Sequence, residues 1–118
     1  MTVTVNFLGR SVGLGAKQSF NQSPDEKVQY VLNVGNFSTT VSGTPVVEKV
    51  VDIEAIDTDV KSTVVGTQAV SVSGTLITLP TLESLTIGKS YRVHVTHVNG
   101  GNTAETYENH FIVRCRVE

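Results

Sequence analysis

Tryptophan is absent from this 118-residue chain, and cysteine and methionine occur once each. With Cys115 as the single thiol, no disulfide can form within the chain, which excludes a disulfide-stapled secreted module. Charged residues make up 17% of the chain and the formal net charge is −2, whereas a general nucleic-acid-binding domain is basic. No window approaches the roughly 18 apolar residues of a membrane helix. We therefore expect no nucleic-acid partner and no membrane partner.

The first residues also lack the features of a secretion signal. Residues 1–8 contain no basic segment and no continuous apolar run. Instead, Val3, Val5 and Phe7 alternate with polar residues, which predicts a strand. We expect synthesis in the cytoplasm.

Side chains branched at the β-carbon are abundant in this sequence. Valine occurs 21 times and threonine 15 times, against seven leucines. Such side chains are stiff at χ1 and fit a pleated, half-buried surface, so the composition favours strands over a helical bundle. A length of 118 residues predicts one domain, residues 1–118, that can bury its own core.

Alternation of apolar and polar residues recurs along the chain between turn residues. The alternating stretches span residues 1–8, 27–34, 46–56, 60–64, 68–79, 91–96 and 111–117. Residues 21–25 form a polar stretch, and Gly74 is expected to form a tight turn or bulge. Seven to eight short strands with no helix between them predict an all-β fold, an antiparallel β-sandwich of immunoglobulin-like size. The residues predicted to face inward are Val28, Tyr30, Leu32, Val51, Ile53, Val93, Val95, Phe111, Val113 and Cys115.

The sequence contains no complete catalytic or phosphate-binding motif. Residues 88–90, Gly-Lys-Ser, end like a phosphate-binding loop, but the position where that loop needs its first glycine is Glu83. No Gly-x-Ser-x-Gly elbow occurs, and Cys115 lies among apolar partners, as a buried thiol does. Asp52 and Glu54 share one face of a strand, which we interpret as solvated. We therefore expect no enzymatic activity and no cofactor.

The histidines do not complete a metal site in the sequence. His94 and His97 are three residues apart on a strand, so they point to opposite faces. His94 and His110 can approach across a hairpin, but zinc takes three or four protein ligands, and Cys115 faces the other way. Asp57 and Asp59 fall short of the six to eight oxygens that calcium takes, and turn capping explains them better. We predict no metal site.

The charged residues are unevenly distributed. The last two strands project four basic side chains from one outward face, our candidate interface: Arg92, His94, Arg114 and Arg116. Five acids lie around the middle strand: Glu48, Asp52, Glu54, Asp57 and Asp59. Two ordinary solvated faces explain this pattern. Alternatively, unlike surfaces of neighbouring copies meet, with charge setting their register; the planar guanidinium of arginine suits such an interface.

Residues 85–95, Leu-Thr-Ile-Gly-Lys-Ser-Tyr-Arg-Val-His-Val, resemble the turn into the penultimate strand of fibronectin type III and related immunoglobulin-like domains. Leu85, Gly88 and Tyr91 match the spacing of their tyrosine corner, in which the hydroxyl bonds back to the upstream backbone. Residues 99–102 match the glycine-rich loop before the last strand. The chain departs from the type III pattern in having no tryptophan.

A second resemblance, over residues 45–118, is to small immunoglobulin-like structural proteins of tailed bacteriophages. The features that carry it are Val50-Val51-Asp52-Ile53-Glu54, Asp57-Thr58-Asp59-Val60, Gly88-x-x-Tyr91-Arg92-Val93, Gly100-Gly101, Glu105 and Phe111-x-Val113. The resemblance implies a non-catalytic virion protein, made in the host cytoplasm, that decorates or stabilises the capsid or sits at the head–tail junction. It would act in many copies or as a homo-oligomer through contacts with capsid or other virion structural proteins.

A bacterial cell-surface adhesin or carbohydrate-binding module would share the fold and remains the alternative. Such a protein normally carries a secretion signal and often exposes aromatic side chains for stacking on sugars. The seven aromatic residues here fall mostly at inward positions.

Overall fold

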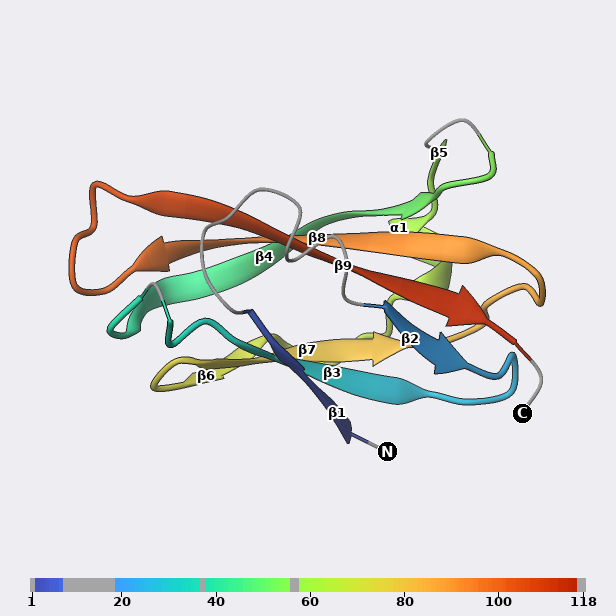
Figure 1. Ribbon diagram of the computed structural model, residues 1–118, viewed down its shortest axis with the longest axis horizontal. Coiled ribbons are helices and arrows are strands. Elements are labelled where there is room, and N and C mark those ends of the chain that lie inside the picture. The colour runs from blue at the N-terminus through green and yellow to red at the C-terminus, as the bar shows by residue number, and fades with distance from the viewer. Residues whose placement is uncertain (1, 8–18, 37, 56–57, 117–118) are drawn as a thin grey trace.

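The computed structural model describes residues 2–7, 19–36, 38–55 and 58–116. Within them, nine strands form two sheets that pack face to face (Figure 1). The four-stranded sheet has the order β1 (Thr2–Asn6), β3 (Val28–Asn33), β7 (Leu76–Leu82), β6 (Ser71–Ser73). The five-stranded sheet has the order β2 (Ser19–Gln22), β9 (Thr106–Cys115), β8 (Ser90–Asn99), β4 (Val41–Asp52), β5 (Thr58–Asp59). The predicted β-sandwich is confirmed; the one helix in the described residues is the four-residue α1 (Lys61–Val64).

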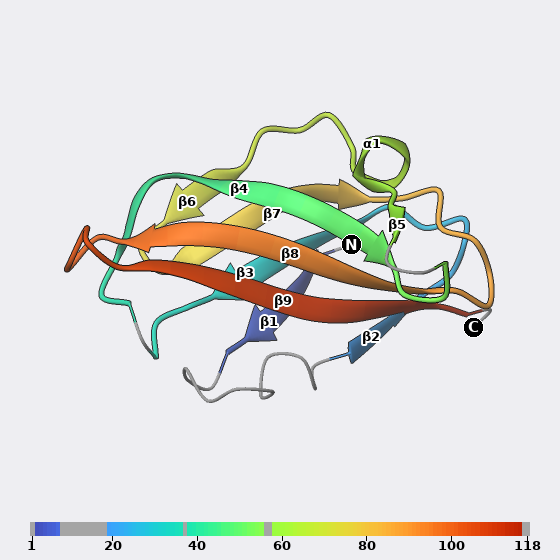
Figure 2. The same cartoon turned by 90° about the horizontal axis from the view of Figure 1, so that it is seen from above.

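Most strand pairs run antiparallel, as predicted, and two pairs run parallel. β1 is parallel to β3, and β2 is parallel to β9, while the other pairs are antiparallel. β1 and β2 follow each other in the chain but lie in different sheets, as Figure 2 shows from above. Alternation in a sequence identifies a strand but carries no information about its partner or direction, so these pairings were not predictable from it.

The first part of the polar stretch at residues 21–25 is a strand, because Asn21 and Gln22 belong to β2. The Gln22 side chain is fully buried. Its amide nitrogen donates to the Leu82 carbonyl at 2.7 Å and to the Glu26 carbonyl at 3.0 Å. Its amide oxygen accepts a hydrogen bond from the Tyr30 hydroxyl at 3.0 Å. This one side chain therefore links the five-stranded sheet to β3 and β7 of the other sheet.

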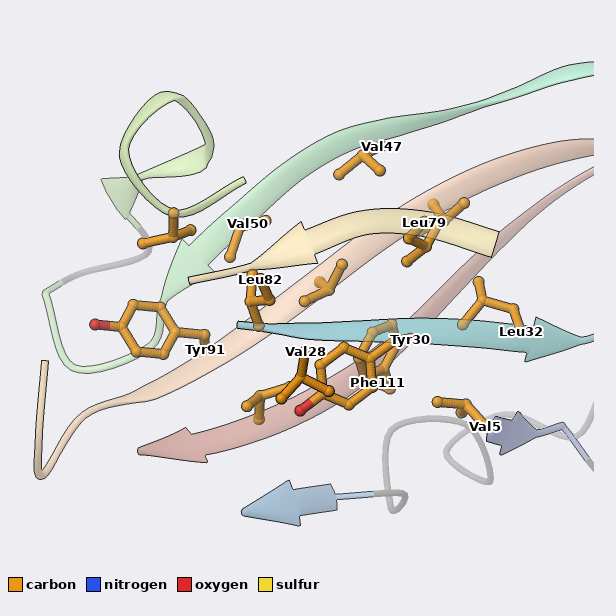
Figure 3. Packing of buried hydrophobic residues seen from close by; sticks show 14 of the residues in the cluster. Val5, Val28, Tyr30, Leu32, Val47, Val50, Leu79, Leu82, Tyr91 and Phe111 are labelled. Atoms are coloured by element: carbon orange, nitrogen blue, oxygen red, sulfur yellow. The ribbon is translucent and has the colours of Figure 1, made fainter. Parts of the chain in front are cut away.

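The hydrophobic core fills the space between the sheets (Figure 3). Its centre is a ring cluster from three strands: the Tyr30 and Phe111 centroids are 5.1 Å apart, and Phe20 lies 5.9 and 6.2 Å from them. Such tilted aromatic contacts add to the stabilisation that burial provides. The residues that were predicted to face inward and are buried in the hydrophobic core are Val28, Tyr30, Leu32, Val93, Val95, Phe111, Val113 and Cys115.

The prediction for the middle strand is wrong in its parity. The pairing of β4 with β8 shifts between Val47 and Lys49, where a bulge adds one residue and reverses the alternation beyond it. Val50 therefore lies in the core, opposite Val93. Val51 is buried but lies on the outer face of the sheet opposite Arg92, and Ile53 is only half-buried beyond the end of the strand. 

Three further expectations are corrected in detail. Residues 60–64 form the turn of α1 rather than a strand, with Val64 buried. Strand β4 begins at Val41, before the alternating stretch at residues 46–56. β7 continues through Pro80 to Leu82, and Pro80 lies where the β3–β7 register shifts, so its missing N–H removes no regular ladder bond. Gly74, with φ of +63°, makes the tight turn between β6 and β7.

Candidate functional site

The tyrosine corner lies at the start of β8. Tyr91 is buried, and its hydroxyl accepts a hydrogen bond from the backbone N–H of Thr86 at 2.8 Å. Leu85 is buried beneath the same turn, and Gly88 has a φ of +87°, which favours glycine. The Gly88 N–H donates to the Cys115 carbonyl at 3.0 Å. The structure thus brings Leu85, Gly88 and Tyr91 together in the arrangement expected from their spacing, with the turn bonded to the end of β9.

Asp52 lies on the inner side of this corner, which corrects its assignment to a solvated acidic face. Its side chain is buried opposite Tyr91, and the Lys89 Nζ donates to Asp52 Oδ2 at 2.7 Å. The hydrogen bond from Lys89 lowers the pKa of the Asp52 carboxyl, and a bond from the Glu54 N–H at 3.1 Å acts in the same direction. Asp52 therefore serves its own chain and is not available to the arginines of a neighbour.

The other acids of the predicted cluster are dispersed. Asp59 Oδ1 accepts from the N–H groups of Val50 and Lys61, at 3.2 and 3.0 Å, so it caps the turn before α1. Glu48 and Glu54 are exposed. Asp57 lies outside the described residues, so the structure does not describe the Asp57–Asp59 pair.

The four residues of the candidate interface share the outer face of the five-stranded sheet but differ in exposure. Arg114 and Arg116 are exposed at the end of β9. Arg114 donates to the Ser19 hydroxyl of β2 at 3.0 Å, and Arg116 to the Cys115 carbonyl at 2.9 Å. Arg92 is half-buried, and His94 is only 7% exposed. The four predicted residues therefore lie on one face of the sheet, but they are not equally exposed to solvent.

His94 is the centre of a polar cluster that the sequence did not reveal. It lies directly opposite His110 in the β8–β9 pair, with ring centroids 5.7 Å apart. Arg92 Nε donates to His94 Nε2 at 3.0 Å. His94 Nδ1 therefore carries the ring proton and faces Glu108 Oε1 at 3.3 Å. Burial lowers the pKa of His94 and of His110, and the charge of Arg92 lowers both further.

Glu108 is the residue of this cluster that sequence analysis missed. The signal was present, because Glu108 and His110 are two residues apart on one strand and so share a face. Their position beside His94 depends on the register of the β8–β9 hairpin. The sequence does not determine this register, because it does not determine the length of the loop between the two strands. The potential ligand atoms of His94, Glu108 and His110 all lie within 4.8 Å of one another.

A second polar group, Ser38, His97 and Asn109, is arranged like a hydrolase triad but has the opposite proton placement. All three side chains are buried. The Asn109 amide nitrogen donates to the Val95 carbonyl at 3.2 Å and lies 2.8 Å from His97 Nδ1. Nδ1 must therefore accept, so Nε2 carries the proton and donates to the Ser38 hydroxyl at 2.9 Å. In a hydrolase triad, the histidine nitrogen beside the hydroxyl must accept its proton. Here the Asn109 amide fixes the tautomer in which that nitrogen, Nε2, already carries a proton, so His97 cannot act as the general base. This group anchors the segment before β4 to β8 and β9.

The described part of the chain has no helix of the length and apolarity that crossing a membrane requires. No protein family model, curated protein or solved structure matches this chain.

Proposed function

We propose that this protein is a non-catalytic structural protein that acts through repeated protein–protein contacts. The strand order supports an immunoglobulin-like arrangement. β1-β3-β7-β6 corresponds to the A-B-E-D sheet of such sandwiches, and β9-β8-β4 to their G-F-C strands, with β5 in the place of C′. The corner contact of Tyr91 belongs to the same pattern, although the parallel β1–β3 pair departs from it.

The proposed setting is the virion of a tailed bacteriophage, in capsid decoration or stabilisation or at the head–tail junction. Its basis is the sequence resemblance of residues 45–118 to small structural proteins of such phages. Fold by itself does not determine function, so the proposal also depends on features of the protein surface. The partners proposed are capsid or other virion structural proteins, contacted by many copies of this chain.

One surface feature carries the proposal: exposed arginines beside apolar side chains at one end of the five-stranded sheet. Arg114 and Arg116 are exposed there, and the half-buried Ile112 precedes them on the same strand. Ile87, 52% exposed, lies in the turn whose Gly88 bonds to the Cys115 carbonyl. Protein interfaces are enriched in arginine and combine it with a desolvated apolar centre. We call Ile87, Ile112, Arg114 and Arg116 the strand-end patch.

The carbohydrate-binding alternative has less support. Every aromatic side chain in the described residues is buried or half-buried, so none is fully exposed for stacking on a sugar; Phe37 lies outside the described residues. We therefore favour a protein partner for the strand-end patch.

The test is incorporation of the protein into particles. Arg114→Glu together with Arg116→Glu should weaken loading onto purified particles, more at low salt than at high salt, because the Debye length is only about 10 Å at 0.1 M. Lys27→Glu is the charge-matched control, since Lys27 is a 72% exposed cation that is not part of the patch. Equal loading of the folded double variant at every salt concentration would remove the patch from the proposal. If the wild-type protein never copurifies with particles by mass spectrometry, the virion function itself is wrong.

A further inference from the structure

Three side chains that commonly bind metals converge on the outer face of the five-stranded sheet. His94 and His110 are cross-strand partners, and Glu108 is on the same face of β9 as His110. Their potential ligand atoms all lie within 4.8 Å of one another. Ligands at about 2.1 Å around a tetrahedral zinc ion lie about 3.4 Å apart. Binding of one ion therefore requires these distances to shorten by at most about 1.4 Å.

We propose that His94, Glu108 and His110 bind one divalent transition-metal ion of the kind that prefers imidazole, with zinc as the reference ion. Two imidazoles and one carboxylate suit Zn²⁺, Cu²⁺ or Ni²⁺, whereas Mg²⁺ and Ca²⁺ prefer sets made of oxygen atoms. Three protein ligands leave at least one coordination position for water or for a group from a bound partner. This site is independent of the proposed virion function.

The backbone around the three ligands is well suited to hold them in place. His94 is near the middle of β8, which pairs with β9 on one side and with β4 on the other. Its ring is more than nine-tenths buried, so its position is fixed by packing. The Glu108 side chain is 59% exposed, which leaves the site accessible from solvent.

Arg92 opposes metal binding in the present arrangement. Its Nε–H donates to His94 Nε2, which keeps the ring proton on Nδ1, the nitrogen that faces Glu108. A metal on Nδ1 displaces that proton, and the neutral ring then carries its proton on Nε2, where it meets the Nε–H of Arg92. Two donors cannot bond to each other, so Arg92 must turn away. The charges of Arg92 and of Lys49, the β4 partner of His94, also repel a cation. Removal of Arg92 should therefore strengthen the site.

The experiment is a calorimetric titration of the full chain with ZnCl₂ near pH 7.5, followed by NMR of the histidine rings. We expect one saturable site, with shifts at His94 and His110 and none at the internally bonded His97. His110→Gln and Glu108→Gln should each lower the affinity by at least about tenfold. Glu48→Gln is the control, because Glu48 is an exposed carboxylate bonded to Thr96 near the site but outside the ligand set. It should leave the affinity unchanged, and Arg92→Met should raise it.

Circular dichroism of each variant establishes that it is folded. His110 is half-buried and Glu108 exposed, so both substitutions are compatible with the sandwich. Absence of saturable Zn²⁺ binding by both the wild type and Arg92→Met would overturn the proposal. Equal affinities of wild type and His110→Gln would also overturn it, because the ion would then bind elsewhere on the chain.

Discussion

At the scale of single residues, the buried polar side chains of this protein are paired with specific partners. Gln22 bonds to the backbone of β7 and to Tyr30, His97 to Ser38 and Asn109, and Asp52 to Lys89. A buried polar group that lacks a partner costs about 1–3 kcal/mol, so each of these bonds maintains the position of the segment that carries it. In the described residues, no buried side-chain nitrogen or oxygen is left without a hydrogen bond.

The Tyr91 hydroxyl provides a test at this scale. Tyr91→Phe leaves the Thr86 N–H without its acceptor, so we expect the free energy of unfolding to fall by about 0.5–1.5 kcal/mol. Urea denaturation of both proteins measures this difference. Tyr107→Phe is the control: its hydroxyl bonds to Glu105 at a half-buried position, where water can replace it, so the loss should be smaller. No loss for Tyr91→Phe would show that the corner does not stabilise the fold.

The Asp52–Lys89 pair predicts a dependence of stability on pH. The folded protein holds the pKa of Asp52 below its ordinary value, so at low pH the unfolded state binds the proton more readily. The contribution of Asp52 is therefore fully present above the unfolded pKa, near 4, and is lost as pH falls through the folded value. Asp52→Asn should be less stable than wild type at pH 7, with the difference shrinking toward pH 2.

Denaturant unfolding at a series of pH values measures this difference. Lys89→Met should remove the same pH-dependent part, because it removes the first cause of the shift. An equal difference between wild type and Asp52→Asn at pH 7 and pH 2 would contradict the assignment of this ion pair.

At the scale of strands, the face on which a side chain lies depends on the local alternation and on any bulge that reverses it. The alternation in β3 and in the β8–β9 hairpin continues without interruption on the core face, and their predicted inward residues are buried. In β4, the shift between Val47 and Lys49 reverses the alternation, so that Val50 enters the core and Asp52 faces inward. A bulge at this position places Glu48 and Lys49 both at the surface. The bulge also bends β4, which pairs with β5 only at Val51 and Asp52. Bulges in such edge strands discourage pairing with other chains.

At the scale of the whole molecule, the aromatic cluster joins the two sheets. Phe111 of β9 is fully buried against Tyr30 of β3 in the opposite sheet (Figure 3). Phe20 of β2 contacts both rings.

Phe111→Ala tests the contribution of this cluster to stability. Removal of the ring leaves a cavity between the sheets, and we expect a loss of roughly 3–5 kcal/mol in the free energy of unfolding. Val46→Ala is the control, since Val46 is 48% exposed and should change stability by less than about 0.5 kcal/mol. Calorimetric or denaturant unfolding gives both values. Similar losses for the two variants would mean that Phe111 is not in the core.

The sequence by itself determined the features that depend on local periodicity and spacing. Alternation of β-branched residues predicted a sandwich and the inward residues of β3, β8 and β9, and the resemblance to immunoglobulin-like domains predicted a corner at Leu85, Gly88 and Tyr91. These follow from the period of two in a strand and from a turn whose partners are close in the chain.

Only the tertiary structure decided the features that depend on partners far apart in the chain. The parallel pairing of β1 with β3 and of β2 with β9, the burial of Gln22 and the ion pair of Asp52 arise from contacts between separate segments. The convergence of His94, Glu108 and His110 likewise requires the register of two strands as well as the alternation within each. A polar residue has no local signature of burial, because its partner can come from any segment that the fold brings beside it.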